Sequence, residues 1–150
     1  MYKLFTILTL AGLSLASCKK DEETPSNKFA GTWKSTTADM YHNNVFQLTE
    51  TLDDFVIILN NCASPIGTFC DGSVNEGNSA DITSMKYSIS EGETYFIIDE
   101  DGDVATTEDR IASEIVLINN NQFHIATTYT DTDDNGNNIN VKVVTKMTKQ

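Results

Sequence analysis

The chain has 150 residues, enough for one domain, and its 10 basic and 22 acidic side chains give a net charge of -12. Such an acidic surface disfavours nucleic-acid binding, which needs a basic footprint, and electrostatic adsorption to anionic lipid. Only two prolines and several runs rich in valine, isoleucine and phenylalanine argue against wholesale disorder.

Residues 1–17 are expected to be a lipoprotein signal peptide rather than part of the fold. Lys3 is the only charged residue before an uncharged apolar run at 4–15. This run is too short for a membrane-spanning helix, which needs about 20 residues. A basic start, an apolar middle and small residues at the end are typical of a secretory signal.

The signal ends on Leu15-Ala16-Ser17-Cys18, which resembles the lipobox of bacterial lipoproteins. The resemblance implies that the chain is cut before Cys18 and that its thiol forms a thioether to diacylglycerol. It also implies that the new amino group is acylated, and several acyl chains hold a protein at a membrane far more firmly than one. The alternative is an ordinary signal peptide followed by a coincidental cysteine.

Residues 18–28 are expected to be the lipidated cysteine and a flexible tether, because 19–28 is polar and lacks apolar side chains. The order Cys, Lys, Lys, Asp, Glu, Glu resembles the export signal of Bacteroidetes-type lipoproteins. In that group, acidic residues after a lysine direct the protein to the outer face of the outer membrane. The resemblance implies a lipid-anchored protein of the bacterial outer membrane, facing the cell surface. A generic solvated linker is the alternative.

The stretch from Val45 to Asn60 fits two kinds of secondary structure. Its apolar residues recur at a helical spacing, but 55–59 also reads as a buried strand rich in β-branched residues. Asp53 and Asp54 break the pattern. We expect two strands here, with a helix as the alternative.

Cys62 and Cys70 are expected to form a disulfide, because Cys18 is used for lipid and the cell envelope is oxidising. Pro65 and Gly67 can turn the chain between them. A redox-active pair is more often Cys-x-x-Cys, and a zinc pair would need further cysteine or histidine partners.

The second half of the chain predicts antiparallel strands. Apolar and polar residues alternate in three segments, so each has one face for a core and one for water. Two shorter runs are nearly continuously apolar. The five predicted strands are 83–89, 94–98, 114–118, 122–130 and 139–147. Turn-forming residues at 91–93, 119–121 and 131–138 join them into an up-and-down meander.

The folded part, expected at 29–150, opens on Gly31-x-Trp33 in its first strand. This motif resembles the start of lipocalins and fatty-acid-binding proteins, the calycin folds, and with the lipobox it is similar to lipocalin-like lipoproteins of the Bacteroidetes type. The resemblance implies an all-β, antiparallel up-and-down barrel of about eight strands. It also implies that Trp33 closes the barrel base, with Lys146 or Lys149 packed across the indole.

Alternation predicts which side chains face the interior of such a barrel. Thr127 and Thr145 would leave space there, whereas His124 and Lys142 should face outward. Tyr87 and Tyr129 could orient a ligand by hydrogen bonds. Besides Trp33, the candidate ligand-contacting residues are Met85, Tyr87, Ile97, Phe123, Ile125, Tyr129, Val141 and Val143.

Motifs for enzymatic chemistry are not found, and we expect no enzyme, no cofactor and no metal site. The sequence has no glycine-rich phosphate loop and no Gly-x-Ser-x-Gly elbow, and it has only two histidines. The segment 131–136 resembles half of a calcium loop, but Asn138 and Lys142 stand where an EF-hand needs an apolar residue and a glutamate. A hairpin tip is the better interpretation. The acids at 99–103 favour a solvated loop over a weak cation site.

Two functions of different class follow from this fold. The first is a membrane-anchored lipocalin-like lipoprotein that binds a small apolar ligand inside the barrel. The second is a filled barrel that serves as a structural or protein-interaction module on the cell surface. The fold alone does not choose between them.

Overall fold

The computed structural model describes residues 27–52, 55–76, 82–100, 104, 107, 110–133 and 135–150. The signal peptide, the lipidated Cys18 and most of the tether therefore lie outside the described residues. The described part of the chain contains strands and no helix, so it holds no helix that could cross a membrane. The strands are β1 (Gly31–His42), β2 (Val45–Thr51), β3 (Phe55–Leu59), β4 (Cys70–Glu76), β5 (Ile82–Ile89), β6 (Tyr95–Asp99), β7 (Arg110–Ile118), β8 (Gln122–Thr132) and β9 (Asn138–Lys149).

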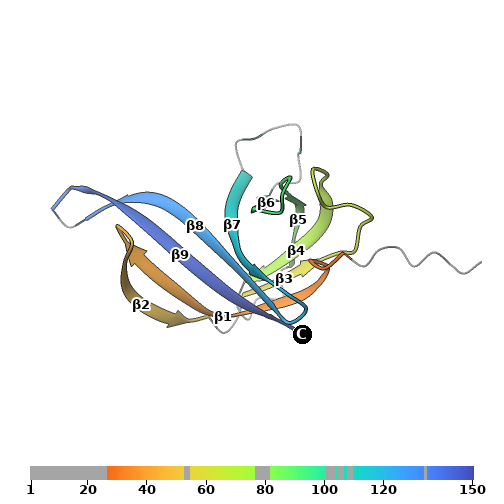
Figure 1. Ribbon diagram of the computed structural model, residues 1–150, viewed down its shortest axis with the longest axis horizontal. Coiled ribbons are helices and arrows are strands. Elements are labelled where there is room, and N and C mark those ends of the chain that lie inside the picture. Colours follow the sequence, from red (N-terminus) through yellow and green to blue (C-terminus); the bar gives the residue numbers. More distant parts are fainter. Residues whose placement is uncertain are drawn as a thin grey trace, which may run out of the picture.

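Eight of these strands close into an antiparallel barrel. Neighbours pair in the order β1, β3, β4, β5, β6, β7, β8, β9, and β9 returns to pair with β1 (Figure 1). From β3 onward each strand pairs with the next strand along the chain. The predicted all-β, up-and-down barrel of about eight strands is confirmed, with β2 as one extra strand.

β1 is long enough to pair with two strands along one of its edges. Residues 31–34 pair with β3, and residues 37–42 pair with β2. A bulge between Ser35 and Thr37 separates the two halves. There the Ser35 hydroxyl donates to the carbonyl of Phe55 over 2.9 Å and lies 3.2 Å from that of Leu52. The buried hydroxyl thus bonds to the backbone where β2 gives way to β3.

The far halves of β1, β8 and β9 extend beyond the barrel together with β2. This extension, at the left in Figure 1, comprises β2, 37–42, 128–132 and 138–144, and we call it the arm. β7 pairs with β8 through residues 123–126, and the hydroxyl of Thr127 still bonds to Ser113 of β7, so β8 leaves the barrel wall beyond Thr127.

The expectation of two strands in 45–60 is confirmed, and the helix alternative is wrong. The alternating segments appear as β5, β8 and β9, and the apolar runs as β6 and β7. β4 was not predicted. Its sequence, CDGSVNE, is mostly polar and carries a glycine, and Val74 is its one β-branched residue.

The loop between β8 and β9 is the expected hairpin tip. Asp133 Oδ1 accepts hydrogen bonds from the backbone N–H groups of Asn135 and Asn137, at 2.9 and 2.8 Å. Gly136 takes the left-handed conformation, with φ of 80°. The Asp133 carboxylate is therefore used to fold its own turn.

Candidate functional site

An aromatic cluster fills one end of the barrel. Trp33, Phe96 and Phe123 are fully buried, and Phe29 lies against them. The ring of Phe123 meets those of Trp33 and Phe96 edge-on, with centroids 5.5 and 5.2 Å apart. Each such pair contributes about 0.5–1.5 kcal/mol beyond the area it buries. We call this end the closed end.

Trp33 joins the two ends of the folded chain. Its indole Nε1 donates to the carbonyl of Phe29 over 2.7 Å, and Lys149 Nζ lies 5.2 Å from the ring centroid. Of the two expected lysines it is therefore Lys149 that packs over the indole, while Lys146 bonds to Asp39. Gly31 makes room for Lys149, because a Cβ there would lie 2.5 Å from Lys149 Cε.

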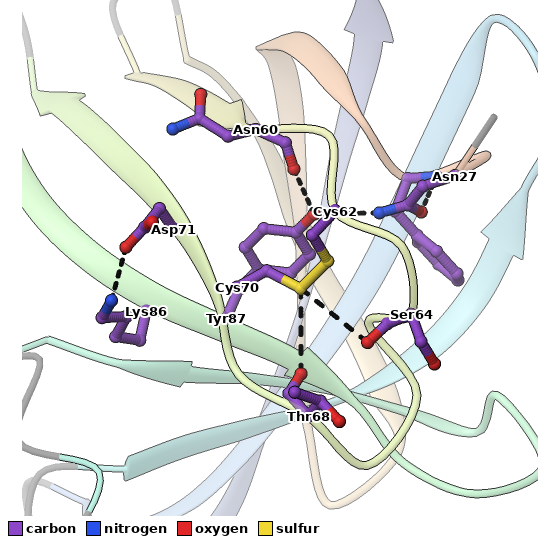
Figure 2. Close-up of a disulfide and its surroundings, with 10 residues drawn as sticks. Asn27, Asn60, Cys62, Ser64, Thr68, Cys70, Asp71, Lys86 and Tyr87 are labelled. Carbon is purple, nitrogen blue, oxygen red and sulfur yellow. Dashed lines mark hydrogen bonds and ion pairs between the residues drawn. A yellow bond between two sulfur atoms is a disulfide. The ribbon is translucent and has the colours of Figure 1, made fainter. Parts of the chain in front are cut away.

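The disulfide between Cys62 and Cys70 is present, with their Cα atoms 6.1 Å apart, as the sequence predicts. Figure 2 shows it beside Tyr87, whose hydroxyl donates to the Asn60 carbonyl over 2.7 Å and accepts from Asn27 Nδ2 at 3.0 Å. Burial raises the pKa of Tyr87, so its hydroxyl stays protonated at neutral pH. Both hydrogen bonds of this tyrosine serve the fold.

The other half of the barrel holds a cavity of about 560 Å³, which opens between exposed residues. Its floor is formed by Ile57, Met85 and Ile125, which are buried at the border of the aromatic cluster. Six of its lining residues are phenylalanine, isoleucine or valine, and Met85 adds a seventh apolar side chain. The full lining is Phe55, Ile57, Val74, Thr83, Met85, Ile98, Glu100, Ile111, Ser113, Ile125, Thr127 and Thr145.

The polar groups of the cavity are few. Ser113 and Thr127 share a hydrogen bond between their hydroxyls, with the oxygens 2.7 Å apart. Thr83 and Thr145 add two further hydroxyls, and Glu100 supplies one carboxylate at the exposed rim. An apolar cavity with a few polar groups is the usual form of a small-molecule site, and such sites span about 300–1,000 Å³.

Two of the candidate ligand-contacting residues, Met85 and Ile125, line this cavity. Tyr87 and Phe123 also point inward, but they are fully buried in the closed end. The prediction that Tyr87 offers its hydroxyl to a ligand is therefore wrong, since both its hydrogen bonds are made with Asn27 and Asn60.

The expected inward position of Ile97 is also wrong. Ile98 lines the cavity and pairs with the buried Tyr87, so its neighbour Ile97 faces outward. The sequence Tyr-Phe-Ile-Ile-Asp is apolar on both faces, and alternation could not tell which face is inside.

Tyr129, Val141 and Val143 lie on the inward-facing side of β8 and β9, as expected, but on the arm rather than around the cavity. Val141 is buried opposite Tyr129, which is itself 47% exposed. A ligand in the cavity is therefore not expected to depend on the Tyr129 hydroxyl.

Several lining residues were missed because their strands gave no usable alternation. Phe55 and Ile57 lie in a continuous apolar run, and Val74 lies in the polar strand β4. Ile111 and Ser113 precede the segment that was recognised as a strand. That Ile111 and Ser113 face the interior follows only from the register between β6 and β7, which pairs them with the inward-facing Ile98 and Phe96.

The outer face carries the ion pairs. Asp71, Lys86, Asp99 and Arg110 are cross-strand neighbours on β4 to β7, so opposite charges alternate across four strands. Lys86 pairs with Asp71, and Arg110 Nε lies 3.1 Å from Asp99. These groups stabilise the barrel wall and leave the interior to apolar side chains.

A second charged group on the outer face joins β1, β8 and β9. The Lys146 ammonium, 2.6 Å from Asp39, and the Thr49 hydroxyl lower the pKa of Asp39. Burial and the positive charge of Lys146 lower the pKa of His124, which pairs with Lys146 in register. His124 and Lys142 both face outward, as predicted; Lys142 lies 3.5 Å from Glu114.

The described residues thus define a closed, antiparallel eight-stranded barrel with one filled end and one open, mostly apolar cavity. In this part of the chain no group of three or more histidine, cysteine, aspartate or glutamate side chains is arranged to hold a metal ion. No protein-family model, curated protein or solved structure matches the chain.

Proposed function

We propose that this protein is a membrane-anchored, lipocalin-like lipoprotein of the bacterial envelope that binds a small apolar ligand in the open half of its barrel. The observation that carries the proposal is the cavity of about 560 Å³ above Met85 and Ile125. A barrel of about eight strands is just wide enough to hold one small ligand. The apolar lining supplies the binding free energy, and the four hydroxyls orient the ligand.

The proposed anchor depends on the sequence around Cys18. Lipid chains at that residue, followed by the tether 19–28, would hold the barrel close to the outer membrane. Replacing Cys18 with serine should abolish incorporation of labelled palmitate and release the protein from the membrane fraction. Unchanged labelling and fractionation would contradict the anchor and leave the cavity proposal untouched.

The ligand proposal is tested by filling the cavity. A neutral, environment-sensitive apolar dye should bind the chain from Lys19 onward, which retains all nine strands, with an affinity in the micromolar range, about -8 kcal/mol. Thr145→Phe places a ring in the cavity and should weaken dye binding at least tenfold, a loss of about 1.4 kcal/mol.

Thr128→Phe is the matched control. Thr128 is exposed on the opposite face of the neighbouring strand β8, so the same substitution leaves the cavity open. Its dye affinity should equal that of the unmodified chain. If the folded protein binds no apolar probe, or if the two variants bind equally, the ligand-binding proposal fails.

The alternative is a structural or protein-interaction module. One observation favours it: all seven residues of β2 are exposed, including Val45, Phe46 and Leu48. Val45 and Leu48 lie on the same face of the arm as Tyr129, whereas Phe46 packs against Tyr41 on the other face. Single exposed apolar groups are common, but several on one face often mark a contact surface. This function would become the better one if the cavity bound no probe.

A further inference from the structure

We infer that the cavity selects apolar ligands with a positively charged polar end and disfavours carboxylates such as fatty acids. The inference rests on the proposed function and names the ligand class for the same site. Its basis is the set of charges around the cavity: one carboxylate lies in the lining, and among the described residues no basic side chain does.

Glu100 supplies that carboxylate. Phe96 and Ile98 point into the barrel, and Glu100 follows on the same face, one residue beyond the end of β6. It therefore stands at the rim, where the polar end of a ligand whose apolar part fills the cavity would lie. Glu100 is exposed, so its side chain stays hydrated when the cavity is empty.

The basic side chains of the described residues are placed elsewhere. Lys28 pairs with Glu93, and Lys149 lies over Trp33, both at the closed end. The others named here pair on the outer face of the barrel and arm: Lys86 with Asp71, Arg110 with Asp99, Lys142 with Glu114 and Lys146 with Asp39. Lys34 alternates with the buried Trp33 and Ser35 and so points outward.

A bound carboxylate would therefore meet an acidic side chain and, within the part of the chain that the structure describes, no basic one. It would give up part of its hydration without a charged partner, which is costly even at a partly exposed site. An ammonium group would instead pair with the Glu100 carboxylate, and it could donate further hydrogen bonds to the hydroxyl oxygens of the lining. The net charge of -12 also attracts a cationic ligand at long range and so favours the same ligand class.

The test compares three probes with the same dodecyl chain: dodecylammonium, 1-dodecanol and dodecanoate. Each displaces the neutral dye from the chain starting at Lys19, at neutral pH, low salt and concentrations below micelle formation. Dodecylammonium should bind about tenfold more tightly than dodecanoate, with the alcohol between them, since an exposed charge pair contributes about 0.2–1 kcal/mol in each direction. The difference should shrink as salt is added.

Glu100→Gln should reduce this difference to about threefold or less. The matched control is Glu91→Gln, which makes the same charge change in an exposed turn after β5, at the closed end. It should leave the difference as in the unmodified chain. Equal effects of the two variants would show that net charge alone sets the preference and would overturn the role of Glu100.

The outcomes separate this inference from the proposed function. If all three probes bind equally, or if dodecanoate binds most tightly, the ligand class is wrong while the cavity remains a binding site. If the dye itself does not bind, so that there is nothing for the three probes to displace, the proposed function has failed.

Discussion

Trp33 combines three kinds of interaction at the closed end. Its ring packs edge-on against Phe123, its indole N–H bonds to Phe29, and Lys149 covers it from the last strand. The first and last strands are thereby fastened to each other where the barrel closes. Gly31 permits this packing, with φ of 139°, a value that L side chains rarely adopt.

Replacing Trp33 with alanine should lower the free energy of unfolding by about 3–5 kcal/mol, because a large, fully buried aromatic side chain is lost. Urea unfolding followed by circular dichroism measures the loss. Lys149→Ala, which removes only the exposed cation over the ring, should cost about 0.5–1 kcal/mol. A loss below about 1 kcal/mol for Trp33→Ala would place this residue outside the core.

Stability should fall on acidification in two steps. The folded-state pKa of His124 is lowered by burial and by Lys146, so below about pH 6.5 the unfolded chain binds a proton more readily. The pKa of Asp39 is lowered by Lys146 and Thr49, so its stabilising contribution is lost below about pH 3.9.

Two variants should therefore change how the free energy of unfolding depends on pH. His124→Gln should remove the first decline, and Asp39→Asn should flatten the second. Neither should alter dye binding, since both residues face outward. If His124→Gln keeps the same slope between about pH 7 and about pH 5, the assignment of the first step to His124 is wrong.

At the scale of elements, alternation identified β5, β8 and β9 and their inward faces. It failed where a strand is apolar on both sides, as in β3 and β6, or polar throughout, as in β4. It also could not show that the distal parts of β8 and β9 leave the barrel, because this depends on how far β7 pairs along β8. Accordingly Met85 and Ile125 were found, and most other lining residues were not.

The disulfide fastens the loop before β4 to the closed end. Replacing Cys62 and Cys70 together with serine should lower the free energy of unfolding by about 2–3 kcal/mol, as expected for a loop of this length. Urea unfolding of the oxidised protein and of the double variant gives the difference. Equal midpoints, or two free thiols in protein isolated from the cell envelope, would contradict a stabilising bridge.

On the scale of the whole molecule, the barrel is divided into two unequal environments. The aromatic residues crowd the closed end, whereas isoleucine, valine and hydroxyl side chains line the open end and leave space. No single strand predicts this division, because each of β3 to β9 contributes to both halves. Thr127 and Thr145, expected to leave room, do line the cavity.

Methionine methyl NMR tests binding in this cavity most directly. The chain from Lys19 onward has three methionines, one in each region: Met85 in the cavity floor, Met147 in the closed end and Met40 on the arm. On titration with 1-dodecanol, the Met85 methyl signal should shift and saturate, while those of Met147 and Met40 stay in place. An unmoved Met85 signal, or a shift confined to Met40, would contradict a ligand-binding barrel.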